Sequence, residues 1–312
     1  MAAERPDPSQ PPVAKNQDAF SDFDDILAEA SMESPWRHSV GLAPVFQPDY
    51  ELLCHLLAVP LGAGDKTQSG RFAKAIDAWF AHELRRSGFG VDEVWPRAAR
   101  PRVISQDVMA LLTKLPRRLA DEVRELLVNK GLGAADARIL GRAYVKQVDV
   151  AIARWDRGPE LILSTKAMSS SFGKNLSNRF EEAYGDAGNL RARYPLSAVG
   201  FAFLQRGSIV RDEPGAFTRT MDMMRKLRDR GDGNGYTATS LILIDWDDVD
   251  PASTVQFVHD AVPNDIHVPQ FMRSVIETIL EATPVDEHVR VRELYENRHL
   301  PVQESEVPLP EQ

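Results

Sequence analysis

Hydrophobic residues recur every three or four positions in several parts of this 312-residue chain, and this spacing is typical of amphipathic helices. One such helix is predicted over residues 70–87, with Gly88 ending it. A second is predicted over residues 175–190, where the apolar stripe consists of Leu176, Phe180, Ala183, Ala187 and Leu190. Further helices are expected over residues 49–59, 106–131, 216–230 and 269–282, with a break in the second of these at Pro116.

Strands are predicted where apolar and β-branched residues cluster: residues 90–95, 143–153, 160–166, 197–205 and 239–246. The second and third form a hairpin, because the intervening WDRGP segment has the composition of a turn. If the turn centres on Arg157–Gly158, Asp149 lies opposite Lys166, with Cβ atoms roughly 5 Å apart. Ser164 shares the face of Lys166, since side chains alternate along a strand.

A carboxylate beside a lysine at the end of a hairpin can hold a divalent metal and orient a water molecule, as a phosphodiesterase site requires. At these residues the chain resembles the PD-(D/E)XK nuclease superfamily over roughly residues 70–205. Asp149 matches the first Asp of the motif and Lys166 matches its lysine, whereas Ser164 stands where the motif has an acid. Hard cations prefer carboxylate oxygens, so Ser164 leaves the site short of negative charge.

The resemblance extends to a Ser-x-Lys variant, seen in some type II restriction enzymes, in which the missing acid comes from the next helix. Glu181 and Glu182 lie 15 and 16 residues after Lys166 and are the candidates for this acid. They fall on opposite flanks of the apolar stripe, so periodicity does not choose between them, and both could be surface charges. In the first helix, Asp77 is favoured over Glu83 as a further metal ligand, with a solvated helix charge as the alternative for each.

The resemblance implies an α/β fold with a restriction-endonuclease-like mixed central sheet flanked by helices. We expect a disordered acidic tail over residues 1–35, a single domain over 36–285 and a charged, proline-containing tail over 286–312. Residues 106–131 would be a helical insertion in this domain, and residues 206–285 a C-terminal extension. The resemblance also implies Mg²⁺, with Mn²⁺ as a substitute, bound by Asp149, Asp77, Glu181 or Glu182 and the backbone carbonyl of Thr165.

The net charge of −9 does not by itself indicate a nucleic-acid-binding protein. Residues 166–230, however, hold 12 Lys and Arg against 7 Asp and Glu, a local balance of +5. Phosphate contacts need a local positive surface, so double-stranded DNA is the expected partner. The candidate DNA contacts are Lys174, Arg179, Arg191 and Arg193. The basic residues of the insertion are either a solvated face or further phosphate contacts.

A single cysteine, Cys54, argues against a disulfide framework and suits a cytoplasmic protein. No apolar run reaches the ~18 residues of a membrane span, and no nucleotide-binding loop is found. The sequence therefore predicts a metal-dependent DNA endonuclease that acts in restriction or phage defence. A homodimer is compatible with this function. Two alternatives remain, namely a structure-specific repair or junction-resolving nuclease, and a catalytically inactive DNA-binding or scaffold subunit of the same fold.

Overall fold

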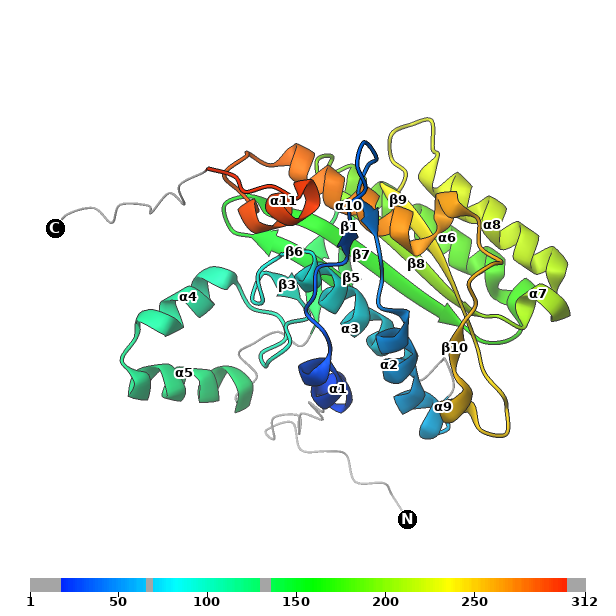
Figure 1. The fold of residues 1–312 in the computed structure, drawn as a ribbon, viewed down its shortest axis with the longest axis horizontal. Coiled ribbons are helices and arrows are strands. Elements are labelled where there is room, and N and C mark those ends of the chain that lie inside the picture. Colours follow the sequence, from blue (N-terminus) through cyan, green and yellow to red (C-terminus); the bar gives the residue numbers. More distant parts are fainter. Residues whose placement is uncertain (1–17, 66–69, 130–135, 302–312) are drawn as a thin grey trace, which may run out of the picture.

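A six-stranded mixed sheet forms the centre of the computed structural model, which describes residues 18–65, 70–129 and 136–301 (Figure 1). The strand order is β10-β9-β8-β7-β6-β3. The three central strands β7, β8 and β9 are parallel, and the other neighbouring pairs are antiparallel. The strands are β3 (Val94–Trp95), β6 (Val150–Arg154), β7 (Gly158–Met168), β8 (Ala198–Arg206), β9 (Ala238–Asp245) and β10 (Gln256–Phe257).

Helices cover both faces of this sheet, because each face carries its own hydrophobic core. The first core is built with residues of α2 (Tyr50–Gly62), α3 (Arg71–Arg86) and α10 (Val268–Ala282). The second is built with residues of α6 (Phe172–Arg191) and α8 (Pro214–Arg228). The chain is therefore a mixed α/β protein with helices on both sides of the sheet, as expected.

Smaller elements connect and extend this framework. Two short sheets are formed by β1 with β2 and by β4 with β5. These strands are β1 (Trp36–Arg37), β2 (Val45–Phe46), β4 (Ala137–Leu140) and β5 (Val145–Val148). The remaining helices are η1 (Ser21–Phe23), α1 (Asp24–Glu29), α4 (Gln106–Lys114), α5 (Arg117–Asn129), α7 (Ile209–Asp212), α9 (Pro251–Thr254), η3 (Asn264–Ile266) and α11 (Val289–Glu296).

The prediction of one strand over residues 143–153 is wrong, because the chain bends at Asp149 and separates β5 from β6. The predicted register of the hairpin is also wrong. Val150 lies opposite Leu163, so position 149 falls opposite Ser164 and not opposite Lys166. A register shift between Ile152 and Ala153 and a tighter turn, with Arg154 paired to Gly158, account for the displacement.

Part of each segment that the sequence assigned to a tail packs against the first hydrophobic core. Residues 18–35 include η1 and α1, and Phe23 is completely buried. The Arg102 guanidinium holds this segment through ion pairs of 2.7 Å with both Asp18 and Asp24. At the other end α11 packs onto the first core through Val291. Burial of apolar side chains stabilises both segments, and the predicted tails over residues 1–17 and 302–312 lie outside the described residues.

Candidate active site

Asp77 is a fully buried residue of α3, a helix in which most side chains are buried. Its Oδ1 atom accepts a hydrogen bond of 2.5 Å from the Thr165 hydroxyl. Its Oδ2 atom lies 3.3 Å from the Lys74 ammonium, which is also 3.7 Å from Asp136. The interpretation of Asp77 as a solvated helix charge is therefore wrong, since the side chain points toward β7.

Asp149 lies at the bend between β5 and β6 and faces the same residue of β7. Its Oδ2 atom accepts a hydrogen bond of 2.8 Å from the Thr165 backbone N–H, and its own N–H donates to the Leu163 carbonyl at 3.1 Å. Thr165 thus contacts two carboxylates at once, one through its side chain and one through its backbone. This brings together Asp77 and Asp149, two residues that the sequence placed among the metal ligands.

Burial and mutual repulsion disfavour the charged forms of both carboxylates. Burial, and next the negative charge of Asp149, raise the pKa of Asp77 from 3.8 to about 7. Burial also raises the pKa of Asp149, while the Thr165 N–H and the charges of Lys166, Lys74 and Lys146 act in the opposite direction. Binding of a cation next to these two carboxylates would therefore stabilise their charged forms.

Lys166 and Ser164 point away from Asp77. Because Thr165 turns its side chain toward α3, its neighbours along β7 point to the opposite face of the sheet. Lys166 is half-buried and its charge acts on Asp149. Ser164 is buried, and its Oγ atom has no hydrogen-bond partner among the described residues. Ser164 therefore forms no hydrogen bond with either carboxylate.

Glu181 and Glu182, the candidates for the migrated acid, are both exposed on α6. Glu182 forms an ion pair of 2.9 Å with Arg179 on the same helix. Within the described chain, no group of three acidic, histidine or cysteine side chains at metal-binding distance contains either glutamate. Glu83, the less favoured acid of the first helix, is buried against Arg86 at 2.8 Å and accepts a hydrogen bond from the Asp49 N–H.

The acid that α6 directs inward is Asp186. It is buried, forms an ion pair of 2.5 Å with Lys146 and accepts a hydrogen bond of 3.0 Å from the Tyr144 hydroxyl. The charge of Lys146 acts on Asp149, where it opposes the larger effect of burial on the pKa, so this pair belongs to the surroundings of the site. Sequence reasoning missed Asp186, although a polar residue within the stripe that holds Ala183 and Ala187 was a usable signal.

The candidate DNA contacts are spread over α6 and beyond it. Lys174 is exposed in the first turn of α6, which follows directly on β7, whereas Arg179 is paired with Glu182. Arg191 donates a hydrogen bond to the Ser197 carbonyl, and Arg193 contacts the Tyr194 ring. These last two arginines belong to the other end of α6, so of the four candidates Lys174 is the one that is exposed at the start of this helix.

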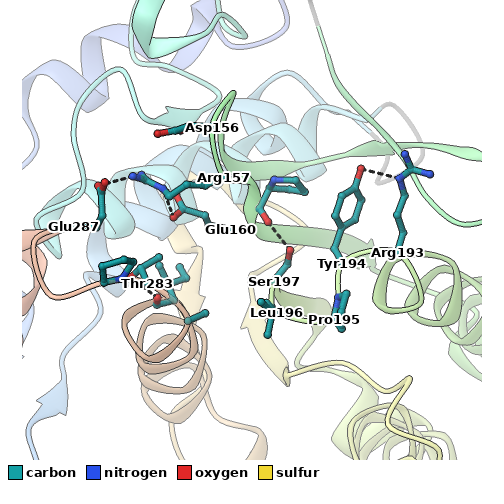
Figure 2. Close-up of a pocket in the computed structure, with 14 residues that line it drawn as sticks. Asp156, Arg157, Glu160, Arg193, Tyr194, Pro195, Leu196, Ser197, Thr283 and Glu287 are labelled. Atoms are coloured by element: carbon teal, nitrogen blue, oxygen red, sulfur yellow. Dashed lines mark hydrogen bonds and ion pairs between the residues drawn. The ribbon is translucent and has the colours of Figure 1, made fainter. Parts of the chain in front are cut away.

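A pocket of about 550 Å³ lies at the turn end of the β6–β7 hairpin (Figure 2). Arg193, Tyr194 and Leu196 line one side of it, and Arg157 and Glu287 line the other. Arg157 forms ion pairs with Glu287 and, at 2.8 Å, with Glu160. Because Glu160 lies near the start of β7 and Thr165 follows five residues later along the strand, this pocket is distinct from the Asp77–Asp149 pair.

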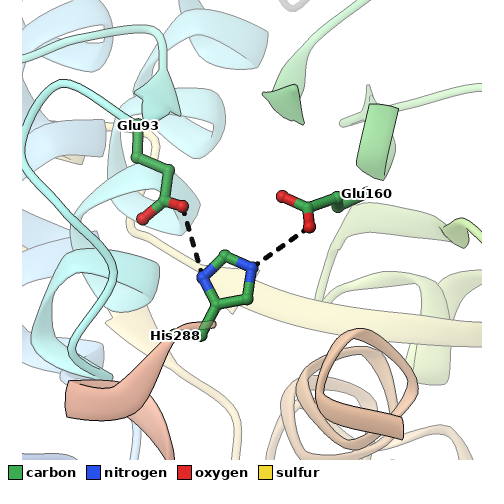
Figure 3. Close-up of side chains that lie close together, drawn as sticks. All are labelled: Glu93, Glu160 and His288. Atoms are coloured by element: carbon green, nitrogen blue, oxygen red, sulfur yellow. Dashed lines mark hydrogen bonds and ion pairs between the residues drawn. The ribbon is translucent and has the colours of Figure 1, made fainter. Parts of the chain in front are cut away.

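Beside this pocket, the His288 imidazole lies between the carboxylates of Glu93 and Glu160 (Figure 3). Its Nδ1 atom is 3.2 Å from Glu93 and its Nε2 atom is 3.2 Å from Glu160. The two carboxylates offset the cost of burial and raise the pKa of His288 to about 9. Since each nitrogen faces a different carboxylate, the arrangement suits a doubly hydrogen-bonded imidazolium better than one metal ion held by all three residues.

The Asp77–Asp149 pair fits a magnesium ion by the chemistry of its donors. Mg²⁺ is commonly bound by one or two carboxylates, with water and substrate phosphate completing its octahedral shell. The Thr165 carbonyl is a third oxygen on the Asp149 side, because the N–H and C=O of one strand residue point to the same side of the strand. Asp77, Asp149 and the Thr165 carbonyl are therefore oxygens that could hold a magnesium ion, whereas Glu181 and Glu182 lie exposed on α6.

No family model matches this chain, and no match was found among curated proteins or among solved structures. In the described part of the chain, no helix is both long and apolar enough to cross a membrane.

Proposed function

We propose that this protein is a Mg²⁺-dependent DNA endonuclease whose site is built from Asp77, Asp149, Thr165 and Lys166. The observation that carries the proposal is the double contact of Thr165, which holds the buried carboxylate of Asp77 and the half-buried carboxylate of Asp149 against one strand residue. Holding two like charges together away from water is costly, and Lys74 is the cation that lies 3.3 Å from Asp77. Such a cost is typical of functional sites, where strongly shifted pKa values concentrate.

The order of elements supports a restriction-endonuclease-like fold for this site. The helix α3 is followed by Gly88–Phe89 and then by β3, as the resemblance implies for the start of the nuclease core. The hairpin of β6 and β7 then carries Asp149 and Lys166, and α6 leads into β8, which is parallel to β7. The site lies where β7 extends past the end of β6, so one side of Thr165 is free to contact Asp149.

Phosphodiester hydrolysis requires a water oxygen to bond to phosphorus while the bond to the leaving sugar oxygen breaks and that oxygen gains a proton. A magnesium ion held by Asp77, Asp149 and the Thr165 carbonyl would polarise the phosphate and acidify water. Lys166 points away from Asp77 but its charge acts on Asp149, so from the Asp149 side it would orient the attacking water and stabilise the negative charge that develops on the phosphate. Lys174 would contact a neighbouring phosphate from the start of α6.

Cleavage of supercoiled plasmid and of phage DNA with Mg²⁺, with Mn²⁺ or with EDTA tests the proposal. Asp149→Asn removes one charge with little change of shape, and Asp260→Asn makes the same change at an exposed position. We expect metal-dependent fragments that disappear only in Asp149→Asn. Cutting restricted to branched substrates would favour a junction-resolving or repair nuclease, whereas equal cutting by both variants would refute this site.

One observation favours a second candidate, a catalytically inactive DNA-binding subunit. The Lys74 ammonium lies 3.3 Å from Asp77 and supplies positive charge that a metal would otherwise supply. If this ion pair replaces the metal, Mg²⁺ would not bind. Isothermal titration of the wild-type chain with Mg²⁺ separates the candidates, because an active site requires a heat of binding that Asp149→Asn abolishes.

A further inference from the structure

We infer that α4 and α5 form the dimerisation surface of this protein, with the same two helices of a second copy as the partner. The two helices project away from the sheet at one end of the molecule (Figure 1). Neither hydrophobic core includes a described residue of α4 or α5. Helices this short are marginally stable in water unless an apolar face is packed. Because the described residues of α4 and α5 contribute to neither core, we expect a further packing partner for them.

The apolar face of these helices is open. Among their described side chains only Leu112 and Ala120 are buried. Leu111 of α4 is 56% exposed, and Leu119 and Leu126 of α5 are 39% and 44% exposed. Leu119 and Leu126 are seven residues apart and Val123 lies between them, so the three share one stripe of α5. A continuous apolar stripe of this kind marks a protein contact rather than a solvated surface.

The charges beside this stripe indicate a second copy rather than DNA. Residues 106–129 carry four cations (Lys114, Arg117, Arg118 and Arg124) and four anions (Asp107, Asp121, Glu122 and Glu125), a net charge of zero. The three arginines already pair within α5, at 3.9 Å from Arg117 to Asp121, 3.1 Å from Arg118 to Glu122 and 3.0 Å from Arg124 to Asp121. A phosphate backbone would find no excess positive charge here.

The order of charges along the stripe is self-complementary. Arg118 precedes Glu122 and Glu125 on the flank next to Leu119 and Leu126. Two α5 helices packed antiparallel, with Leu119 of each copy opposite Leu126 of the other, would therefore bring Arg118 of each copy toward Glu125 of the other. A twofold contact of this kind places the same patch of both copies together, as symmetric dimers require.

The test is sedimentation of the full-length protein. We expect a wild-type dimer, and at least about a hundredfold weaker association in Leu119→Glu/Leu126→Glu, because buried leucines become charged. Val249→Glu is the matched control, since Val249 is 93% exposed and lies outside these helices. A monomeric wild-type protein, or a dimer that survives the double substitution, would overturn the inference.

A charge exchange tests the antiparallel contact without altering the leucines. Arg118→Glu and Glu125→Arg each place like charges across the interface, so each variant alone should associate more weakly than wild type. Mixed in equal amounts they should form a heterodimer of near wild-type affinity, because the contacts between position 118 of one copy and position 125 of the other then join opposite charges. If the mixture associates no better than the separate variants, the antiparallel pairing is wrong.

A cleavage readout connects this surface to the proposed nuclease, and it rests on that proposed function. The dimer should linearise plasmid DNA, whereas Leu119→Glu/Leu126→Glu should produce nicked circles, since one site cuts one strand. A protein that is dimeric in sedimentation but cuts no DNA would contradict the proposed function and leave the dimer inference standing.

Discussion

The Thr165 hydroxyl donates a hydrogen bond of 2.5 Å to Asp77, and this contact joins residues 88 positions apart in the sequence. The backbone N–H of the same threonine binds Asp149 at 2.8 Å. One residue of β7 therefore sets the relative positions of a carboxylate from α3 and a carboxylate from the bend before β6. Loss of the hydroxyl should disturb one of these contacts and leave the other intact.

Thr165→Val tests whether the two contacts of Thr165 are independent, because valine keeps the shape of threonine and the backbone N–H but lacks the hydroxyl. Asp77 would lose a buried hydrogen bond, so we expect the free energy of unfolding to fall by about 1–3 kcal/mol. The pKa of Asp77 should rise further, which would shift the pH–rate profile of cleavage to higher pH. Urea unfolding and cleavage rates measure the two effects. Thr165→Ser keeps a hydroxyl and should retain most of both properties.

The stability of the metal-free protein should depend on Asp77. Its folded pKa of about 7 exceeds the ordinary value of 3.8, so the folded state binds the proton more tightly than the unfolded state. This contribution to stability is complete below pH 3.8 and is lost as the pH rises to about 7. Asp77→Asn should therefore flatten the dependence of the unfolding free energy on pH across this window.

Magnesium should restore the stability that is lost when Asp77 ionises, because the metal binds the ionised carboxylates. We expect Mg²⁺ to raise the melting temperature of the wild-type protein more at pH 8 than at pH 5. The same increase should be absent from Asp77→Asn and from Asp149→Asn. An increase of equal size in all three proteins would place the bound metal elsewhere.

His288 provides a second pH-dependent contribution, in a different window. Its pKa is raised from 6.5 to about 9 by Glu160 and Glu93, so the stabilisation is complete below pH 6.5 and is lost as the pH rises through 9. The difference in pKa corresponds to on the order of 3 kcal/mol. His288→Asn suits the backbone, whose φ is 53°. This variant should be less stable than wild type at pH 6 and nearly equal to it at pH 10 in urea unfolding.

The glutamates of α6 and Asp186 should behave differently when neutralised. Glu181→Gln and Glu182→Gln alter exposed side chains, so cleavage and stability should change little. Asp186→Asn leaves the Lys146 ammonium without its carboxylate partner, and we expect the unfolding free energy to fall by about 1–3 kcal/mol. Cleavage rates and thermal unfolding of the three variants decide which acid of α6 supports the site. Loss of cleavage in Glu181→Gln alone would restore the migrated-acid hypothesis.

The sequence by itself determined most of the elements. Predicted helices over residues 70–87, 175–190, 216–230 and 269–282 correspond to α3, α6, α8 and α10 within a few residues. The predicted break at Pro116 separates α4 from α5. These predictions succeeded because helical periodicity and proline are local signals that the surrounding fold does not alter.

Tertiary structure decided how the site residues meet. The register of β6 against β7 depends on a turn and a bulge that shift the pairing by two residues, and an alternating pattern cannot show such a shift because it keeps the same faces. The exposure of Glu181 and the burial of Asp186 depend on which side of α6 faces the sheet. The contact of Asp77 with Thr165 joins residues far apart in the sequence. Packing of α3 against β7 creates this contact, and no local pattern encodes the distance between the two residues.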